Sequence, residues 1–232
     1  MPKDGHAPDE YEDAFAVPEP GTWPYRVAIA DGATETAFAA RWAQALVEGF
    51  VASDVADPQA FTAFVDVQRS VWAAAVAARL PELPWYAAEK AREGAAAAFL
   101  GLSLRHDGTW HALAVGDCCL LVVRGGAVHL CWPLDAPGQF HHRPVLVHSR
   151  PGTETPVTVR AGTWQPGDRF LLATDALAAW LMQGEAVAGW SGAAFRDRVE
   201  AARRQGLRND DVTLVVIDLD ASDAGLEATR IA

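Results

Sequence analysis

Apolar residues follow two different spacings along this chain, and each spacing predicts a different kind of element. Between Thr36 and Ser53 they recur every three or four residues, which predicts an amphipathic helix. A second helix is predicted over residues 58–78, because Asp57 is a preferred N-cap and a proline follows it. A third, shorter helix is predicted over residues 82–92.

From Ala95 onward, apolar runs of strand length alternate with turn signals. Asp107-Gly108, Gly116-Asp117 and Gly125-Gly126 separate four such runs, and dipeptides of this kind are typical of hairpins. The runs predict an antiparallel meander between residues 96 and 132. The remaining pattern predicts a strand at 27–30 before Asp31-Gly32, a long loop at 133–166 with an edge strand near 156–160, strands at 170–173 and 212–219, and helices near 177–182 and 191–206.

Strands that are grouped apart from helices indicate an α+β fold rather than alternating α/β units. The chain has 232 residues, of which 50% are hydrophobic, so it can bury a sizeable core. We expect a single domain over residues 1–220 and a frayed tail over residues 221–232.

Composition narrows the classes of partner. The formal net charge of −11 argues against nucleic acid, because phosphate contacts need a basic surface. The densest basic stretch, residues 196–204, is interleaved with Glu200 and is interpreted as a solvated helix face. No apolar run approaches the roughly 20 residues that span a bilayer, and the first residues do not resemble a signal peptide. We therefore expect a cytoplasmic protein without a membrane partner.

Cysteines and histidines do not predict a site. Cys118, Cys119 and Cys131 cannot all pair, and neighbours on a strand point to opposite faces, so they are interpreted as core thiols. His141, His142 and His148 lack the spacing of a zinc site and are interpreted as exposed loop residues.

Four short acidic stretches lie beside or at the end of apolar runs, where folding can bring them together: Glu12-Asp13, Asp31-Gly32, Thr174-Asp175 and Asn209-Asp210-Asp211. Clustered carboxylates repel one another and are costly to desolvate, so such a cluster is stable chiefly when cations lie within it. Oxygen ligands favour Mg²⁺ or Mn²⁺ over zinc. The sequence therefore predicts a metal site.

Each carboxylate also has a plain structural interpretation. Asp31 and Asp117 fit turns, Asp175 fits a helix N-cap, and the others fit solvated loop charges, namely Glu12, Asp13, Asp210 and Asp211. These alternatives stay open for each residue taken singly. The agreement among the stretches is what favours the metal site.

In their order along the chain, the motifs resemble those of the metal-dependent Ser/Thr protein phosphatases of the PPM, or type 2C, family, in a divergent form of bacterial type. The resemblance covers nearly the whole chain, through Glu12–Phe15, Val27–Gly32, Gly116-Asp117, Gly167–Asp175 and Asp210–Val216. Each motif is weak alone, whereas five in order are fairly specific. The resemblance implies one domain of this family over residues 1–220, folded as a four-layer α/β/β/α sandwich of two antiparallel sheets flanked by helices.

The resemblance also implies two Mg²⁺ or Mn²⁺ ions per chain and a weaker third ion. The carried-over ligands are Asp13, Asp31, the carbonyl of Gly32, Asp175 and Asp210, with Glu12, Asp117 and Asp211 as secondary candidates. Asp31, Asp175 and Asp210 would be catalytic as ligands of the ions that activate water. The implied reaction is hydrolysis of phosphoserine or phosphothreonine on a protein, with a phosphoprotein substrate and a cognate Ser/Thr kinase as partners.

The departures from the family pattern concern phosphate binding. The glycine after Thr-Asp is Ala176, the Asp-Asn pair is Asp210-Asp211, and Gly-Asp-Ser-Arg is Gly116-Asp117-Cys118-Cys119. The family's phosphate-binding arginine before Glu12 is absent, which leaves the phosphate site unknown among Lys3, His6, Arg26 and Arg41. The alternative function is a catalytically silent binding or regulatory module of the same fold. A nuclease fits less well because basic grooves are lacking, and a nucleotide-binding protein because no Gly-rich phosphate loop is present.

Overall fold

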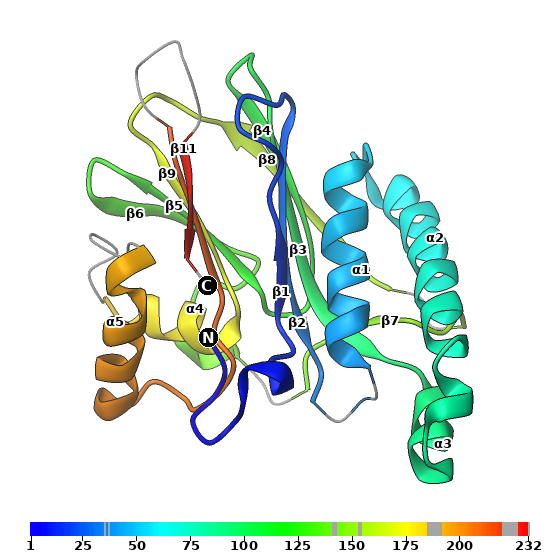
Figure 1. Ribbon diagram of the computed structural model, residues 1–232. Helices are drawn as coiled ribbons and strands as arrows, with labels where there is room; N and C mark the ends of the chain where they lie inside the picture. Colours follow the sequence, from blue (N-terminus) through cyan, green and yellow to red (C-terminus); the bar gives the residue numbers. More distant parts are fainter. Residues whose placement is uncertain are drawn as a thin grey trace.

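Two antiparallel sheets pack face to face, and helices cover the outer face of each sheet (Figure 1). The structure, a computed structural model, describes residues 1–34, 36, 38–140, 143–152, 155–184, 192–219 and 227–231. This arrangement confirms the expected four-layer α/β/β/α sandwich of the α+β class.

The first sheet has the strand order β1-β2-β3-β4-β8, and β7 pairs with one end of β3. Within the described residues its strands are β1 (Ala14–Ala16), β2 (Tyr25–Gly32), β3 (Ala96–Leu104), β4 (Thr109–Val115), β7 (Val147–His148) and β8 (Thr158–Thr163). All nine residues of β3 are buried, because this central strand is covered on both faces.

The second sheet has the strand order β11-β10-β9-β5-β6. Its strands are β5 (Cys119–Arg124), β6 (Ala127–Trp132), β9 (Arg169–Ala173), β10 (Leu214–Asp218) and β11 (Glu227–Ile231). Strands β9 and β10 are neighbours through the register pairs that start at Ala173 and Leu214. This pairing brings together two segments that are about forty residues apart in the sequence.

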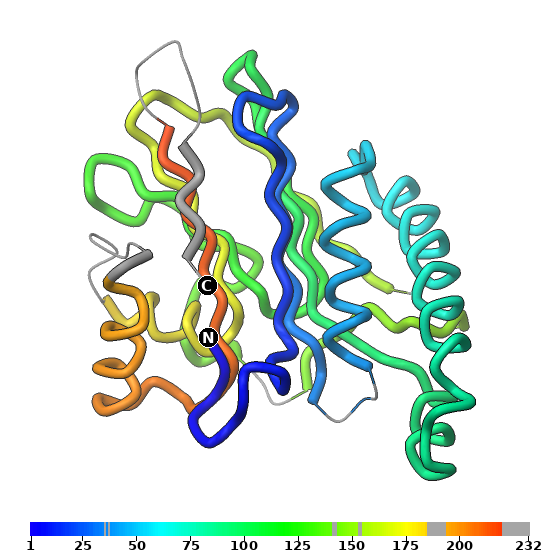
Figure 2. Tube along the Cα trace, in the orientation of Figure 1, coloured from blue at the N-terminus to red at the C-terminus, as the bar shows by residue number. Residues whose placement is uncertain are grey.

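Helices α1 (Ala39–Ala52), α2 (Pro58–Ala77) and α3 (Trp85–Glu93) lie on the side of the first sheet, and α4 (Asp175–Leu181) and α5 (Gly192–Gln205) lie on the side of the second (Figures 1 and 2). Short 3₁₀ turns occur at Pro8–Glu10, Leu80–Glu82 and Pro137–Gln139. The predicted cap of α2 is confirmed, since the Asp57 carboxylate accepts a hydrogen bond of 2.8 Å from the backbone of Ala60.

Alternation along the strands builds three apolar layers. On β3, Phe99 faces helices α1 and α2, whereas Leu100 faces the other sheet. On β9, Leu172 faces the first sheet and Leu171 faces helices α4 and α5. The central strands of each sheet are therefore buried on both faces, which explains why they read as continuous apolar runs, whereas the edge strands β6 and β8 are largely exposed.

The predicted four-strand meander is wrong at its middle turn. The pairs β3–β4 and β5–β6 are hairpins as predicted, but they belong to different sheets. The chain crosses between the sheets at Gly116, which has a φ of +91° and lies so close to Ala98 that an added Cβ would be 2.7 Å from the Ala98 Cβ. Only glycine fits at this position. The dipeptide Gly116-Asp117, predicted as a hairpin turn, is therefore the point at which the chain passes from one sheet to the other.

The structure also adds strands that the apolar pattern did not predict. Strands β1 and β7 are only three and two residues long, too short to show a period. Residues 227–231, which were expected to be frayed, form β11 and pair antiparallel with β10 over five register pairs. That expectation was wrong there because the free edge of β10 supplies backbone hydrogen-bond partners, which a composition argument does not see.

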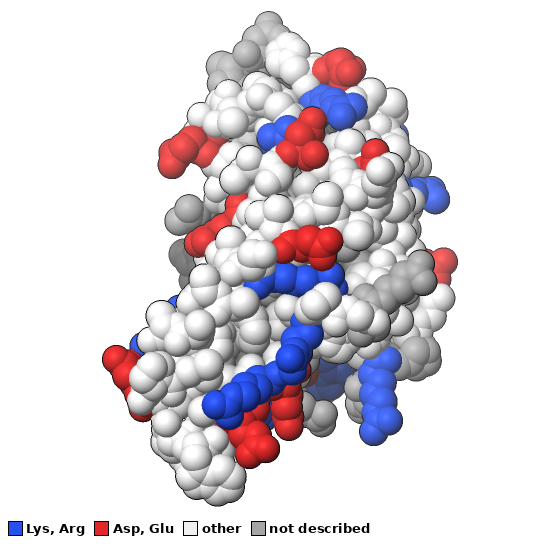
Figure 3. All heavy atoms as spheres, turned by 90° about the vertical axis from the view of Figure 1, so that its right-hand side faces the viewer, with Lys and Arg blue, Asp and Glu red and all other residues white. Residues whose placement is uncertain are grey.

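The outer face formed by α2 carries acidic and basic side chains interspersed among uncharged ones (Figure 3). No large area of one sign is visible on this face. Among the described helices, none is both long enough and apolar enough to cross a membrane.

The contact between Gly101 on β3 and the ring of Phe50 tests this packing. A Cβ at Gly101 would lie 2.6 Å from Phe50 Cζ, and Phe50 is fully buried against Phe99. We expect Gly101→Ala to lower the free energy of unfolding by about 1–3 kcal/mol, because a filled core has no room for an extra methyl group. Urea denaturation measures this change.

The matched control is Gly138→Ala, since an added Cβ at Gly138 meets nothing within 4 Å. That variant should unfold within about 0.5 kcal/mol of the parent chain. Equal stability of the two variants would contradict the packing described for α1 and β3.

Candidate metal centre

Two strand registers bring distant acidic motifs to the same end of the sandwich. The β1–β2 register pairs Ala14 with Ala30, so Asp13 and Asp31 follow as the next opposed residues. In the second sheet, Thr174 and Thr213 follow the pair Ala173 and Leu214, and the Thr174 amide donates to the Thr213 carbonyl at 3.2 Å. Asp13 and Asp31 of the first sheet therefore lie at the same end of the sandwich as Thr174 and Thr213 of the second sheet.

Asp13 bridges the two sheets. Its Oδ2 accepts hydrogen bonds from the hydroxyl groups of Thr213 at 2.7 Å and Thr174 at 3.1 Å. The Thr213 hydroxyl also contacts the hydroxyl of Tyr11. The second carboxylate oxygen of Asp13, Oδ1, is buried and has no hydrogen-bond partner among the described residues. Burial raises the pKa of Asp13 to about 7.

Asp31 lies at the centre of the converging carboxylates. Its pKa is raised well above the ordinary range, first by burial and then by the charges of four neighbours, Asp13, Asp175, Asp117 and Asp210. Asp117, Asp175 and Asp210 line one cleft with Asp31, and Asp13 lies opposite Asp31 in the strand register. The structure therefore brings together acidic residues from five separate segments. The turn interpretation of Asp31 is incomplete, because the residue belongs to β2 and faces the other carboxylates.

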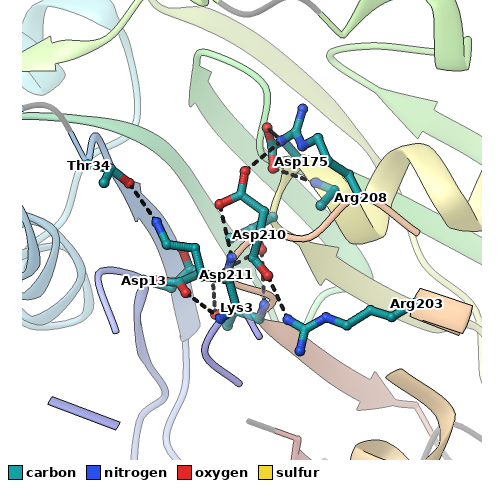
Figure 4. A network of polar contacts seen from close by, with 11 residues as sticks. Lys3, Asp13, Thr34, Asp175, Arg203, Arg208, Asp210 and Asp211 are labelled. Atoms are coloured by element: carbon teal, nitrogen blue, oxygen red, sulfur yellow. Dashed lines mark hydrogen bonds and ion pairs between the residues drawn. The ribbon is translucent and has the colours of Figure 1, made fainter. Parts of the chain in front are cut away.

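Asp175 and Asp210 share one arginine, Arg208 (Figure 4). The Arg208 Nη2 contacts Asp175 Oδ2 and lies 3.1 Å from Asp210 Oδ2. Asp175 is not the N-cap of α4, as the alternative interpretation held, because Thr174 occupies that position and Asp175 is the first helical residue. The Asp175 carboxylate also accepts the backbone N–H of Ala176.

Asp211 and Glu12 have different surroundings from the other acids. The two carboxylate oxygens of Asp211 accept backbone N–H groups, from Lys3 at 2.9 Å and from Glu12 at 2.8 Å. Asp211 thus holds the N-terminal segment in place and is not a loop charge. The Glu12 carboxyl is half-buried. Burial raises its pKa, and this effect is larger than the opposite effect of the hydrogen bond with Thr34.

Asp117 and Gly32 complete the predicted set. Asp117 is buried at the crossing between the sheets, its Oδ2 lacks a partner among the described residues, and burial together with Asp175 raises its pKa to about 7. An added Cβ on Gly32 would lie 2.7 Å from the backbone oxygen of Glu12, so no larger residue fits there.

Arg203 on α5 was missed by the sequence analysis, which assigned its whole stretch to a solvated face. Its side chain is 6% exposed. It donates to the carbonyls of Pro2 at 2.9 Å and Asp210 at 2.7 Å and pairs with Asp4 (Figure 4). That interpretation was wrong for Arg203, because the N-terminal segment folds over it.

A cleft of about 580 Å³ opens beside these carboxylates. Asp31, Asp117, Asp175 and Asp210 line it, and its cationic walls are Arg208 and Arg143. The sequence analysis predicted neither arginine. Arg208 stands two residues before Asp210, next to an acidic motif, and this spacing could have indicated that it lies near the carboxylates. Arg143 comes from the loop before β7, and nothing in the sequence connects it with this end of the fold.

The four sequence candidates for phosphate binding are not among the residues that line the cleft. Lys3 comes nearest, with its Nζ 3.4 Å from the Thr34 hydroxyl at the rim. Arg26 pairs with Asp54, His6 lies 3.8 Å from Glu10, and Arg41 is exposed on α1.

The donor set fits a hard divalent ion. It consists of carboxylate oxygens, two of which, on Asp13 and Asp117, are buried without a hydrogen-bond partner in the described part of the chain. Within that part, however, no three His, Cys, Asp or Glu side chains have the arrangement of a formed metal site. The carboxylates converge, but Arg208 holds two of them.

The cysteines are not nucleophiles. Cys118 and Cys119 are buried, none of the three forms a disulfide, and burial raises the pKa of each thiol, that of Cys131 to about 12. Their prediction as unpaired thiols is confirmed, and Cys118 and Cys119 lie in the core. His148 is exposed at the cleft wall, whereas His141 and His142 lie outside the described residues.

The family assignment follows from comparison with known proteins. The family model of protein phosphatase 2C matches residues 7–215. The chain belongs to the protein phosphatase 2C family. No curated protein matches the chain. The expected family membership is confirmed, and the described fold is that of the family.

Solved structures of the family share the fold at low sequence identity. The serine/threonine phosphatase PstP of Mycobacterium tuberculosis aligns with a TM-score of 0.64 and 19% identity over 95% of this chain and 96% of its own. Stp1 of Staphylococcus aureus aligns with a TM-score of 0.61 and 12% identity over 100% and 93%. A PstP catalytic domain in complex with two manganese ions aligns with a TM-score of 0.58 and 18% identity over 93% and 95%.

The raised pKa of Asp117 predicts a pH-dependent difference in stability. Between about pH 4 and pH 7, unfolded Asp117 is ionised while the folded carboxyl keeps its proton, so the metal-free protein loses stability as the pH rises. Asp117→Asn removes this loss. Its melting temperature, relative to the parent chain in chelator, should therefore rise by several degrees across this window and then level off.

Asp107→Asn is the opposite case. Hydrogen bonds from Thr109 lower the pKa of Asp107, so its stabilising effect is fully present above about pH 4. The melting-temperature difference for that variant should stay constant across the window. A constant difference for Asp117→Asn as well would show that its carboxyl is not desolvated.

Proposed function

We propose that this chain is a metal-dependent protein phosphatase that hydrolyses phosphoserine or phosphothreonine on proteins, with the two-sheet sandwich, β11 included, acting as one catalytic domain. The observation that carries the proposal is the convergence of Asp13, Asp31, Asp175 and Asp210 at one end of the sandwich, beside an open cleft. Family membership supports the reaction class, since PstP and Stp1 are serine/threonine phosphatases.

The proposed ligands of two Mn²⁺ or Mg²⁺ ions are Asp13, Asp31, the Gly32 carbonyl, Asp175 and Asp210, and Glu12 and Asp117 would hold coordinated water. Bound ions would supply a water of lowered pKa for attack on phosphorus and would neutralise charge on the phosphoryl oxygens. Asp211 is assigned a positioning role instead, because both of its oxygens already accept backbone N–H groups.

Thr174 and Thr213 orient Asp13. Both hydroxyl groups donate to the same oxygen, Oδ2, which leaves Oδ1 free to face a ligand. A carboxylate held in this way loses little further freedom when it binds a cation, so the two threonines act as positioning residues.

Arg143 is our candidate for binding the substrate phosphate. It is an exposed residue that lines the same cleft as Arg208, and it forms no ion pair among the described residues. A guanidinium group matches the geometry of a phosphoryl group through two parallel hydrogen bonds. Arg143 would thus replace the family's missing arginine from a different part of the chain.

Loss of Asp31 tests the reaction. We expect Mn²⁺-dependent release of phosphate from a phosphothreonine peptide, and we expect Asp31→Asn to reduce kcat/KM by at least about a hundredfold, since it removes a central ligand. A chelator should abolish the parent activity. Asp66→Asn, on the outer surface of α2, is the matched control and should keep full activity.

If the parent chain binds two ions yet hydrolyses nothing, the phosphatase proposal fails, and the silent binding module of the same fold becomes the better description. If it binds no ion at all, the proposed ligand set fails too.

The role of Arg143 has its own test. Arg143→Ala should lower kcat/KM for the peptide by roughly tenfold to a hundredfold, mainly through KM, because it removes a charge-assisted hydrogen bond to a phosphoryl oxygen. Arg143→Lys should recover part of the loss. Arg41→Ala, a change at the exposed sequence candidate on α1, should leave the kinetics unchanged; the reverse pattern would return the phosphate site to α1.

A further inference from the structure

Arg208 occupies the end of the cleft where two of the proposed ligands meet. Its guanidinium group contacts Asp175 Oδ2 and lies 3.1 Å from Asp210 Oδ2 (Figure 4). Among the ion pairs between described residues, these are the ones that reach the converging carboxylates, and both come from the same nitrogen. The positive charge of Arg208 therefore offsets the repulsion between the carboxylates of Asp175 and Asp210.

The position of Arg208 also explains why the carboxylates converge without forming a ready metal site. Asp175 and Asp210 each direct Oδ2 at the guanidinium group, so these oxygens are not free to face a common ion. An arginine and a divalent ion cannot both lie between the same two oxygens, because their positive charges repel and the space is shared.

The backbone around Arg208 is anchored, while its side chain has room to leave. Leu207 is 5% exposed and packs in the core under α5, and its N–H donates to the Ala202 carbonyl at 2.9 Å. The Arg208 side chain is 40% exposed. A long side chain that is attached to a fixed backbone and borders on solvent can swing out by rotamer changes alone.

We propose that Arg208 is a built-in competitor of the divalent ion that Asp175 and Asp210 would hold, so that this ion binds only when Arg208 leaves the two carboxylates. The inference rests on the proposed function for the existence of that ion. It adds that the two ion positions differ in affinity. Among the described residues, neither Asp13 nor Asp31 forms an ion pair with a side chain, and the Met1 ammonium near Asp13 donates to the Val212 carbonyl at 2.6 Å. Arg208, in contrast, occupies the position at Asp175 and Asp210. The second position then has a weaker apparent affinity for the ion, because only the fraction of molecules in which Arg208 has left can bind it.

Calorimetric titration of the metal-free full-length chain with Mn²⁺ tests this competition. Arg208→Gln keeps the length and polarity of the side chain but removes its charge, and it should tighten the weaker Mn²⁺ site by about tenfold, the size of a lost charge-assisted contact. Arg208→Lys keeps the charge and should stay near the parent affinity. Arg204→Gln, on the exposed side of α5, is the matched control and should not change either affinity.

A second readout separates competition from structural support. In chelator, Arg208→Gln should melt below the parent chain, because Asp175 and Asp210 lose their counter-cation; at saturating Mn²⁺ the two should melt together. If Arg208 instead orients Asp175 as a ligand, Arg208→Gln would weaken Mn²⁺ binding, and the proposal would be overturned.

The outcomes also distinguish this inference from the proposed function. Two Mn²⁺ sites in the parent chain, with unchanged or weaker affinity in Arg208→Gln, would overturn the competition and leave the phosphatase proposal standing. Absence of Mn²⁺ binding in the parent chain and in all variants would overturn both.

Discussion

The buried carboxylate of Asp13 joins the two sheets at the end of the sandwich where the acidic motifs meet. Its Oδ2 accepts hydrogen bonds from Thr174 and Thr213, which directly flank strands β9 and β10 of the opposite sheet. A buried carboxylate is costly unless it is hydrogen-bonded, so these contacts hold the strand ends at one separation. These hydrogen bonds also position two neighbouring carboxylates. Asp31 lies opposite Asp13 in the strand pair, and Asp175 follows Thr174 in the sequence.

The N-terminal segment closes this end of the fold through backbone contacts. The amide of Val212 donates to the Met1 carbonyl at 2.9 Å, and the Asp211 carboxylate accepts the amides of Lys3 and Glu12. An aspartate where the resemblance led us to expect an asparagine is therefore tolerated, because two N–H donors compensate its charge. Within the pair Asp210-Asp211, one side chain lines the cleft and the other supports the chain that surrounds it.

Other departures from the family pattern are absorbed by packing. Cys118, just before β5, packs in the layer between the sheets, whereas Cys119, the first residue of β5, packs in the layer under α4 and α5. Ala176 is 3% exposed in the second of these layers and is a better helix former than the glycine it replaces. Packing does not explain the missing arginine before Glu12. The arginines that line the cleft, Arg143 and Arg208, come from other parts of the chain.

The sequence by itself determined the helices, the longer strands, the fold class and the identity of the acidic motifs, because apolar spacing, turn residues and helix caps are local properties. It did not determine the short strands β1 and β7 or the edge strand β11. It did not determine where the chain changes sheets, since Gly116-Asp117 reads the same in a hairpin and in a crossing. Only the tertiary structure divided the acids into Asp13, hydrogen-bonded to threonines, Asp211, bonded to backbone, and Asp175 with Asp210, paired to Arg208. The physical reason is that hydrogen bonding and charge compensation depend on neighbours that lie far apart in the chain and are brought together only by the packing of the two sheets.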